Sequence, residues 1–363
     1  MQKEYQPIQF PEDESAHDAI IEWWYFNGHL KDEKGNEYSY MDCLFKTDVK
    51  KVKIPFLSKI PLKTSYFSHS LVSDLKNKKF HHRITPFSII SDDSFSKNLL
   101  YVNYVNPEIR NGYSNCVIEK INESKYILKN EDIDLTLISA KTPLLEGGKG
   151  FCKLNSKATY YYSLTNLVTE GRIKIENKWI GVSGKSWMDH QWADVSYTKN
   201  RWDWFSVQLD NNTEMVCFMY DDGQKKTYLA SISYPDNKQE HFEKVKIVPL
   251  PREWVSLKSK AKYPLLWKIK IPEKDIYLIL SAKIENQEML FGSINYWEGP
   301  LSVKGVFGDQ EVNGVGFMEL VGYSSKYNNV KYLRDEVGKT ASKLISSIKN
   351  ETFSIISNSK KHE

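Results

Sequence analysis

The sequence predicts an all-β protein with two antiparallel β-barrel-like domains in series. Segments such as Thr159–Thr165 and Asp203–Leu209 alternate in polarity or hold β-branched and aromatic residues, as strands do. Turn-forming clusters such as Lys31–Asn36 and Asp221–Gln224 recur at short intervals between such segments. Many short antiparallel strands build sandwiches or barrels, and barrels are the form that encloses a small-molecule cavity.

Length and composition narrow the class of protein. The chain has 363 residues, which is enough for two domains with a sizeable core, and its 13% aromatic and 26% charged residues are typical of a globular protein. A net charge of +4 is small for this length, so we expect no nucleic-acid partner. No apolar run approaches the roughly 20 residues of a membrane span, and the first residues lack the apolar core of a signal peptide. We therefore expect a cytoplasmic location.

No cofactor or metal is expected from the sequence. The cysteines are widely separated, in apolar or β-like settings that favour buried, reduced thiols: Cys43, Cys116, Cys152 and Cys217. The histidines are dispersed apart from the adjacent pair His81 and His82, and no His-x-x-x-His pattern is present.

Two basic segments depart from the strand pattern. Residues 330–357 carry an apolar stripe at helical spacing, which predicts an amphipathic helix that packs on a barrel, contacts a membrane surface or associates with itself. The segment Lys46–Lys63 interleaves lysines with apolar residues. It is interpreted as a solvated loop, with peripheral contact to anionic lipid as the alternative. The predicted divisions are an N-terminal domain at 1–192, a C-terminal domain at 193–330 and a helical tail at 331–363; the oligomeric state is left open.

The residues best suited to chemistry lie in Gly184–Trp192. Here Asp189 and His190 are adjacent, and four tryptophans lie nearby: Trp187, Trp192, Trp202 and Trp204. A wall of low dielectric raises a carboxyl pKa toward the range in which it donates protons. Burying a carboxylate among indoles without a purpose would be costly, although a structural salt bridge from Asp189 to Lys185 or Arg201 is the alternative.

The segment Glu22–Leu30 is expected to form the first strand. Alternation places Trp23, Tyr25 and Asn27 on one face, and Glu22, Trp24 and Phe26 on the other. Glu22 is interpreted as an end-cap or salt-bridge partner. The histidines of two apolar strands, His29 and His69, are interpreted as hydrogen-bonded core residues.

Five aromatic and acidic motifs, in order over about residues 20–325, resemble the hydroxyneurosporene synthase family: Glu22–Tyr25, Trp187–Trp192, Trp202–Leu209, Tyr296–Gly299 and Gly316–Tyr323. This is the carotenoid 1,2-hydratase group, whose lipocalin-like relatives include plant-isoflavonoid hydratases and fungal Diels–Alderases. The resemblance implies two lipocalin-like domains with a ligand pocket near their junction. It also implies cofactor-free protonation of an isoprenoid double bond and capture of the cation by water.

The resemblance assigns the acid to Asp189, and His190 and Tyr160 are the further catalytic candidates. Tyr160 lies in a strand where the hydratases use a histidine, so one of their proton-handling groups is replaced here. Aromatic faces stabilise a cation by cation–π attraction. The expected ligand-binding residues are accordingly aromatic: Trp23, Tyr25, Tyr162, Trp187, Trp202, Trp204 and Trp297.

Three functions compete at this point. The first is a cofactor-independent hydratase for an isoprenoid or similar apolar alkene, with Asp189 as the acid. The second is a pericyclase or isomerase in which Asp189 and Tyr160 only hydrogen-bond to a carbonyl. The third is a carrier of a hydrophobic small molecule without chemistry. The remaining motif acids, Asp203, Glu298 and Glu319, are expected to be structural, with a pairing of Glu298 or Glu319 with Arg201 or Lys185 as one option.

Overall fold

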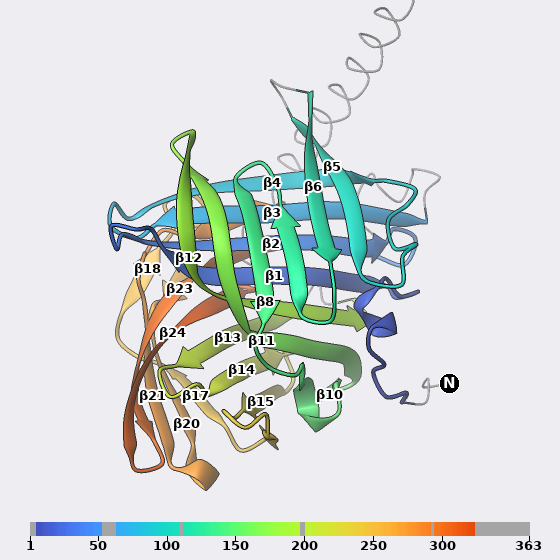
Figure 1. The fold of residues 1–363 in the computed structure, drawn as a ribbon. Coiled ribbons are helices and arrows are strands. Elements are labelled where there is room, and N and C mark those ends of the chain that lie inside the picture. Colours follow the sequence, from blue (N-terminus) through green and yellow to red (C-terminus); the bar gives the residue numbers. More distant parts are fainter. Residues whose placement is uncertain (1–4, 53–62, 109–111, 197–199, 292–293, 324–363) are drawn as a thin grey trace, which may run out of the picture.

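The computed structural model describes residues 5–52, 63–108, 112–196, 200–291 and 294–323, which are built almost wholly of strands (Figure 1). The all-β prediction is thus confirmed. The predicted tail helix lies outside the described residues, as do residues 53–62 of the lysine-rich segment. Three short 3-10 helices occur in the described ranges: η1 (Glu12–Glu14), η3 (Glu146–Gly148) and η4 (Pro272–Lys274).

The first sheet closes into an antiparallel barrel of ten strands, because β11 pairs with β12 on one side and with β8 on the other. The barrel strands are β1 (Ile21–Lys31), β2 (Glu37–Asp48), β3 (Thr64–Asp74), β4 (Lys79–Ile90), β5 (Tyr101–Glu108), β6 (Gly112–Lys120), β7 (Lys125–Lys129), β8 (Ile133–Ser139), β11 (Lys157–Ile175) and β12 (Lys178–Ala193). Two short strands, β9 (Leu144–Leu145) and β10 (Phe151–Leu154), pair with the beginning of β11.

The second sheet is curled but open, with β16 at one edge and β17 at the other. Its strands are β13 (Arg201–Leu209), β14 (Glu214–Asp221), β15 (Lys226–Ser233), β16 (Gln239–Phe242), β17 (Lys246–Pro249), β20 (Leu266–Ile271), β21 (Ile276–Ala282), β22 (Glu288–Phe291), β23 (Ile294–Phe307) and β24 (Gln310–Val321). A separate hairpin joins β18 (Glu253–Val255) and β19 (Lys262–Pro264). The second barrel-like unit of the sequence prediction is therefore a half-barrel.

A tight turn sets the register that matters most for the site. Ile175 pairs with Lys178 across the two residues Glu176 and Asn177, whose φ angles of 48° and 65° suit a two-residue hairpin loop. The β11–β12 ladder that starts at this turn shifts once, between Leu164 and Leu167, and then continues toward the barrel end. This register fixes which side chains of the two strands share a face.

The two sheets pack face to face, with the barrel above the second sheet in the view of Figure 1. Each sheet has a core of its own, one inside the barrel and one inside the curl of the second sheet. A third core lies between the sheets and is called the junction below. Its members from the two sheets include Tyr25, Met41, Leu71, Tyr161, Trp187, Trp204, Val216, Phe218, Met289, Tyr296 and Phe317.

Two further sequence predictions meet the structure here. All four cysteines are free and buried, as expected. The division of the chain at residues 192 and 193 stays a prediction; the first sheet ends at Ala193, and the second begins at Arg201.

Candidate functional site

The alternation of strand β12 turns Asp189 out of the barrel and into the junction. Its neighbour across the ladder is Ser163 of β11, whose hydroxyl lies 2.6 Å from Asp189 Oδ1. The indole of Trp187 donates to the same oxygen at 2.6 Å, and the hydroxyl of Tyr161 donates to Oδ2 at 2.8 Å. Three neutral donors from two neighbouring strands therefore hold the carboxyl in one orientation.

The electrostatic setting of Asp189 is that of a proton donor. Its side chain is almost fully buried, and this desolvation raises its pKa to about 7, although the donors Ser163, Trp187 and Tyr161 act in the opposite direction. Within the described residues, no Lys, Arg or His forms an ion pair with it, so the predicted alternative of a bridge to Lys185 or Arg201 is wrong. Near neutral pH, both protonation states of this carboxyl are populated.

Aromatic rings of both sheets surround this carboxyl. Trp204 of β13 donates its indole N–H to the Tyr161 hydroxyl at 2.8 Å, which links the second sheet to Asp189 through one tyrosine. The Trp204 ring meets Tyr25 edge-on at a centroid distance of 5.5 Å and Trp187 at 6.5 Å. Such ring faces carry negative potential and attract a cation.

A second pair of acids borders the same junction. Glu298 of β23 and Glu319 of β24 are register partners joined by a side-chain hydrogen bond, which requires one of the two carboxyls to be protonated. Tyr25 donates to Glu298 at 2.8 Å, and the Trp202 indole donates to Glu319. Burial raises the pKa of both carboxyls, and that of Glu298 is raised further by the neighbouring charge of Glu319.

Glu146 is a buried acid that sequence reasoning missed. It lies in η3, where its Oε1 is 3.2 Å from the hydroxyl of Ser163, and it also hydrogen-bonds to Ser231 of β15. Desolvation raises its pKa to about 8. An acid between the apolar pair Leu144 and Leu145 and two glycines is a weak sequence signal, since exposed turns share that composition.

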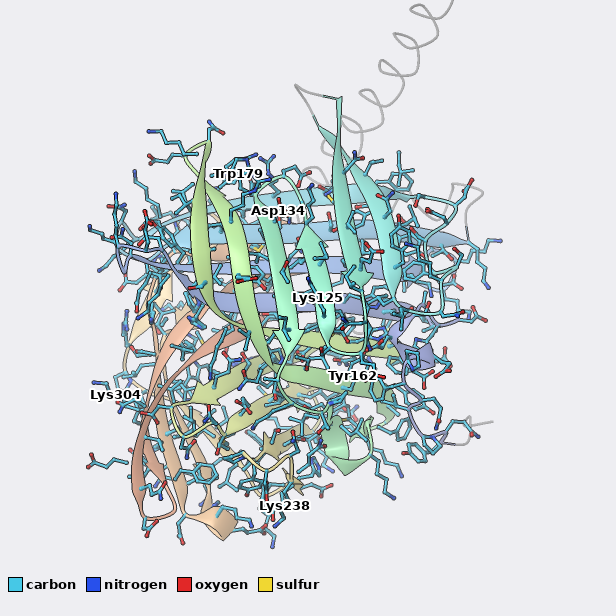
Figure 2. All side chains as sticks on the ribbon, viewed as in Figure 1. Lys125, Asp134, Tyr162, Trp179, Lys238 and Lys304 are labelled. Atoms are coloured by element: carbon cyan, nitrogen blue, oxygen red, sulfur yellow. The ribbon has the colours of Figure 1, made fainter. Side chains whose placement is uncertain are left out.

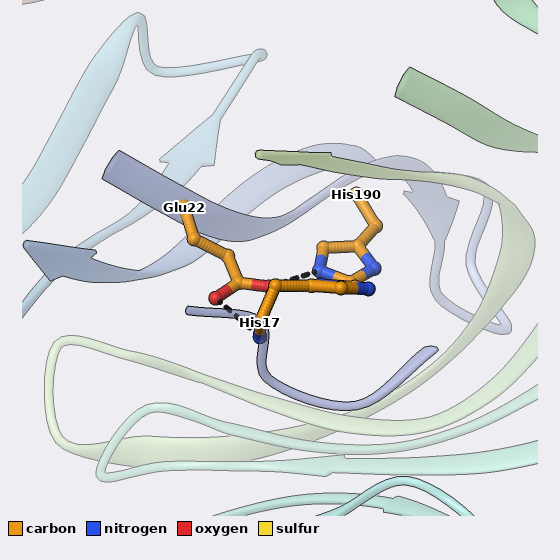
Figure 3. Close-up of side chains that lie close together, drawn as sticks. All are labelled: His17, Glu22 and His190. Atoms are coloured by element: carbon orange, nitrogen blue, oxygen red, sulfur yellow. Dashed lines mark hydrogen bonds and ion pairs between the residues drawn. The ribbon is translucent and has the colours of Figure 1, made fainter. Parts of the chain in front are cut away.

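The other face of β12 carries a different arrangement (Figure 3). His190 points into the barrel, where its Nε2 lies 3.1 Å from Glu22 Oε1, and the Nδ1 of His17 is 2.7 Å from the same oxygen. Lys46 donates to the second oxygen of Glu22 at 2.9 Å. Burial alone would raise the pKa of Glu22, but the partners His17, His190 and Lys46 outweigh it and lower the pKa to about 2.

These groups are also the described residues best placed to hold a metal ion. The ligand atoms of His17, Glu22 and His190 lie within 4.8 Å of one another. However, both Glu22 oxygens already have partners, and the ammonium group of Lys46 supplies a positive charge beside them. The Glu22 carboxylate is therefore satisfied within a buried, hydrogen-bonded ion pair.

Residues 1–323 match the family model described as AttH-like. The chain belongs to the AttH-like family.

Solved structures of this fold resemble the AttH-like chain over most of its length. An AttH-type protein from Nitrosomonas europaea is 24% identical, with a TM-score of 0.68 over 88% of this chain and 98% of that one. Kievitone hydratase from Nectria haematococca is 18% identical, with a TM-score of 0.64 over 87% and 93% of the two chains. CghA, solved with Sch210972, is 14% identical, with a TM-score of 0.54 over 85% and 89%. At these identities the likeness shows a shared fold.

Among characterised relatives, the dehydratase asqC of Emericella nidulans is 24% identical over 206 residues. The match spans 53% of the AttH-like chain and 58% of the dehydratase, so the chain covers little more than half of the length of the dehydratase. Within the described residues, no helix has the length and apolar character needed to cross a membrane.

Two of the expected site residues of the AttH-like chain lie on the face opposite to Asp189. Tyr160 faces away from Asp189; its ring stacks on Trp192 at a centroid distance of 5.2 Å, and the residue that contacts Asp189 is Tyr161. Tyr162 likewise faces the barrel core, where it meets His190 edge-on. Successive residues of a strand point to opposite faces, so a shift of one position exchanges the two environments.

The remaining predicted ligand-binding residues divide between two cores. Trp297 packs in the core of the second sheet and donates to the carbonyl of Glu285 at 2.6 Å, away from the junction. The other five belong to the junction or pack against it: Trp23, Tyr25, Trp187, Trp202 and Trp204. Their role as ligand contacts stays a prediction, as does the catalytic role of Asp189.

The secondary acids have partners other than those predicted. Arg201 lies 3.5 Å from Asp203 and donates to Tyr323, whereas Glu298 and Glu319 bond to each other and to aromatic side chains. The expectation that one of these glutamates pairs with Arg201 or Lys185 is therefore wrong.

The predictions for the core histidines are confirmed. His29 bonds to the carbonyl of Gly316 at 2.8 Å, and His69 bonds to the Tyr296 hydroxyl at 2.5 Å. Both imidazoles are buried, and burial lowers the pKa of each to about 3.

A shallow groove of about 450 Å³ lies on the outer face of the barrel, far from this chemistry. It is lined by Asp134, Thr136, Gly171, Arg172, Trp179 and Gly181, and Figure 2 shows Asp134 and Trp179 at this face. Arg172 pairs with Asp134 at 2.8 Å and lies over the Trp179 ring, so its charged groups are already matched. The groove offers no proton donor comparable to Asp189.

Proposed function

We propose that this AttH-like protein is a cofactor-independent lyase of the hydratase or dehydratase type, with Asp189 as its general acid. One observation carries the proposal: a buried carboxyl at the junction accepts hydrogen bonds from three neutral donors and has a pKa of about 7. Such a group is protonated in part at neutral pH and gives its proton readily, which is the property that general acid catalysis requires.

The mechanism follows from the two oxygens of Asp189. Oδ1 accepts two hydrogen bonds, from Ser163 and Trp187, whereas Oδ2 accepts one, from Tyr161, so Oδ2 has a lone pair free for the transferable proton. Protonation of a carbon–carbon double bond leaves a carbocation and an aspartate. Water then adds to the cation and loses a proton, which completes hydration; the reverse sequence is dehydration.

The junction aromatics stabilise the cation in this scheme. Trp204 and Tyr25 meet edge to face, and Trp187 lies within the same cluster, so a substrate that enters between the sheets meets ring faces. A buried apolar lining favours an apolar alkene, and we propose an isoprenoid or polyene as the substrate class. Two similar proteins, kievitone hydratase and the dehydratase asqC, are named for the addition or removal of water, which is the reaction class proposed here.

The first experiment is extraction of freshly purified protein with organic solvent, followed by mass spectrometry and turnover assays of the co-purified compound. The matched variants are Asp189→Asn and Asp42→Asn. The Asp42 carboxyl is also buried and also has its pKa raised to about 7 by desolvation, but it lies on the barrel face of β2 beside Asn130. We expect Asp189→Asn to lower turnover by about 10²–10⁴-fold, and Asp42→Asn to leave it unchanged.

Other outcomes separate the alternatives. If wild type and Asp189→Asn release the same unmodified ligand and neither changes its mass by one water, the protein is a carrier. If the product is an isomer of equal mass and Asp189→Asn slows its formation only modestly, the pericyclase alternative holds. Equal turnover by wild type and Asp189→Asn would rule out Asp189 as the acid.

A further inference from the structure

A continuous series of hydrogen-bonding side chains runs from Asp189 to the edge of the second sheet. Ser163 lies 2.6 Å from Asp189 Oδ1 and 3.2 Å from Glu146 Oε1, so its hydroxyl bridges the two carboxyls. Glu146 in turn hydrogen-bonds to Ser231. The Ser231 hydroxyl is 3.3 Å from Nδ1 of His241, its register partner on β16. Every member except His241 is buried.

The elements that carry this series come from both sheets and from the turn between them. Ser163 belongs to the barrel, Glu146 to η3, and Ser231 and His241 to the two outermost strands at one edge of the second sheet. Gly148 brings η3 against β16, since a Cβ added to it would lie 3.6 Å from the Cβ of His241. The series therefore connects the barrel side of the junction to a partly exposed histidine.

The donors can all point in one direction. With Glu146 protonated, its O–H donates to Ser163, and the Ser163 hydroxyl donates to Asp189 Oδ1. The Ser231 hydroxyl donates to Glu146, and the Nδ1–H of His241 donates to Ser231. Desolvation favours the neutral form of both Glu146 and His241, which is the state that this orientation needs.

We propose that His241, Ser231, Glu146 and Ser163 form a proton relay that reloads Asp189 from solvent. This inference rests on the proposed function, because it supplies the proton that the acid consumes. In each cycle the carboxyl gives one proton to the substrate from Oδ2 and takes one from Ser163 at Oδ1. A half-turn about the Cβ–Cγ bond then exchanges the two oxygens and returns the new proton to the substrate side. Ser163 is refilled from Glu146, Glu146 from Ser231, and Ser231 from Nδ1 of His241, which binds a solvent proton at Nε2. The proton released by the attacking water returns to solvent, so charge balances.

The four residues act through Asp189 and are positioning residues. They do not touch the substrate in this scheme, and a purely structural role would be expected to change stability without changing proton movement. The test must therefore follow a proton and not only turnover.

The experiment is hydrogen–deuterium exchange of the protonated carboxyls, followed by infrared spectroscopy after a switch from H₂O to D₂O. It is run on the full chain without substrate, just below the pKa of about 7, where Asp189 carries its proton. The bands of the two acids are assigned by their loss in Asp189→Asn and Glu146→Gln. We expect Ser163→Ala and His241→Phe to slow exchange of the Asp189 proton by about tenfold or more, because exchange must then await local opening.

Two variants serve as controls. Ser163→Thr keeps the hydroxyl and should retain fast exchange, and Ser206→Ala removes a buried junction hydroxyl that lies outside the series, where it accepts from the amide of Phe317. Exchange at the wild-type rate in both Ser163→Ala and His241→Phe would overturn the relay. Such a result would leave Asp189 as the acid untouched, whereas a failure of Asp189 itself is detected by the turnover assay of Asp189→Asn.

Discussion

Asp189 and His190 are neighbours on one strand, both buried, and they stand in opposite electrostatic environments. On the junction face, Asp189 meets neutral donors and other acids, and its pKa rises to about 7. On the barrel face, His190 belongs to a group in which Glu22 is held by Lys46 and two imidazoles, and the pKa of Glu22 falls to about 2. Burial is common to both carboxyls, so the presence of a cation decides whether a buried acid gives up its proton or keeps its charge.

Of the changes that test this comparison, removal of Glu22 is expected to have the largest effect on the free energy of unfolding. Glu22→Ala leaves the ammonium of Lys46 buried without its carboxylate, and we expect a loss of about 3–5 kcal/mol in the free energy of unfolding. Urea unfolding at neutral pH measures it. The control is Asp18→Ala, which removes an exposed pair with Lys63 and should change little. A Glu22→Ala variant as stable as wild type would mean that the ion pair between Glu22 and Lys46 does not contribute to the stability of the fold.

A pH series tests the opposite signs of the two acids. The ordinary pKa of an aspartate carboxyl is 3.8, and the pKa of Asp189 in the folded protein is about 7, so the native state binds this proton more tightly than the unfolded chain does. Its contribution to stability is complete below about pH 4 and falls by roughly 4 kcal/mol as the pH rises to 7. Asp189→Asn lacks this loss, so the variant should gain stability relative to wild type over that range.

Glu22 should behave in the reverse sense. Its pKa is lowered from 4.5 to about 2, so its stabilisation is present above about pH 4.5 and disappears as the pH falls toward 2. Glu22→Gln should therefore approach wild type in acid, while Asp189→Asn approaches or exceeds it toward neutral pH. Parallel unfolding curves for Asp189→Asn and wild type across pH 4–7 would contradict the raised pKa of Asp189.

The smallest effect distinguishes two adjacent tyrosines. Tyr161→Phe removes the donor to Asp189 Oδ2 and should raise the pKa of Asp189 by about one to two units, since a hydrogen bond to a charged group contributes roughly 1.5–3 kcal/mol. Tyr160→Phe is the matched control, because that ring lies on the other face against Trp192. Infrared titration of the Asp189 carboxyl measures both. An equal shift in the two variants would mean that the assignment of faces is wrong.

The same tyrosines show how far sequence reasoning reached. Alternation within one strand was sufficient to separate Glu22 and Trp24 from Trp23 and Tyr25, and the structure confirms that division. The choice between Tyr160 and Tyr161 depended on pairing between strands, which the turn at Glu176 and Asn177 and one shift in the ladder determine. A register error of one residue exchanges the two faces completely.

The contacts of the other buried acids were harder to predict from the sequence for a related reason. Glu146 meets Ser163 across the beginning of β11, and Glu298 meets Glu319 only through the pairing of β23 with β24. Tertiary contacts of this kind leave no local periodicity in the sequence. The number of strands and the open second sheet were equally unreadable, because both depend on which strands close a ladder.

Closure of the barrel has a consequence for the order in which the molecule is assembled. The ladder that places Asp189 beside Tyr25 joins β1 to β12, so Ile21 pairs with Ala193 across most of the N-terminal half of the chain. Pairings between such distant residues are entropically expensive and are slow to form. In a partly folded chain we expect Asp189 to be exposed to water and to have an ordinary aspartate pKa. Its pKa rises toward neutral pH only when the ladder between β1 and β12 has formed.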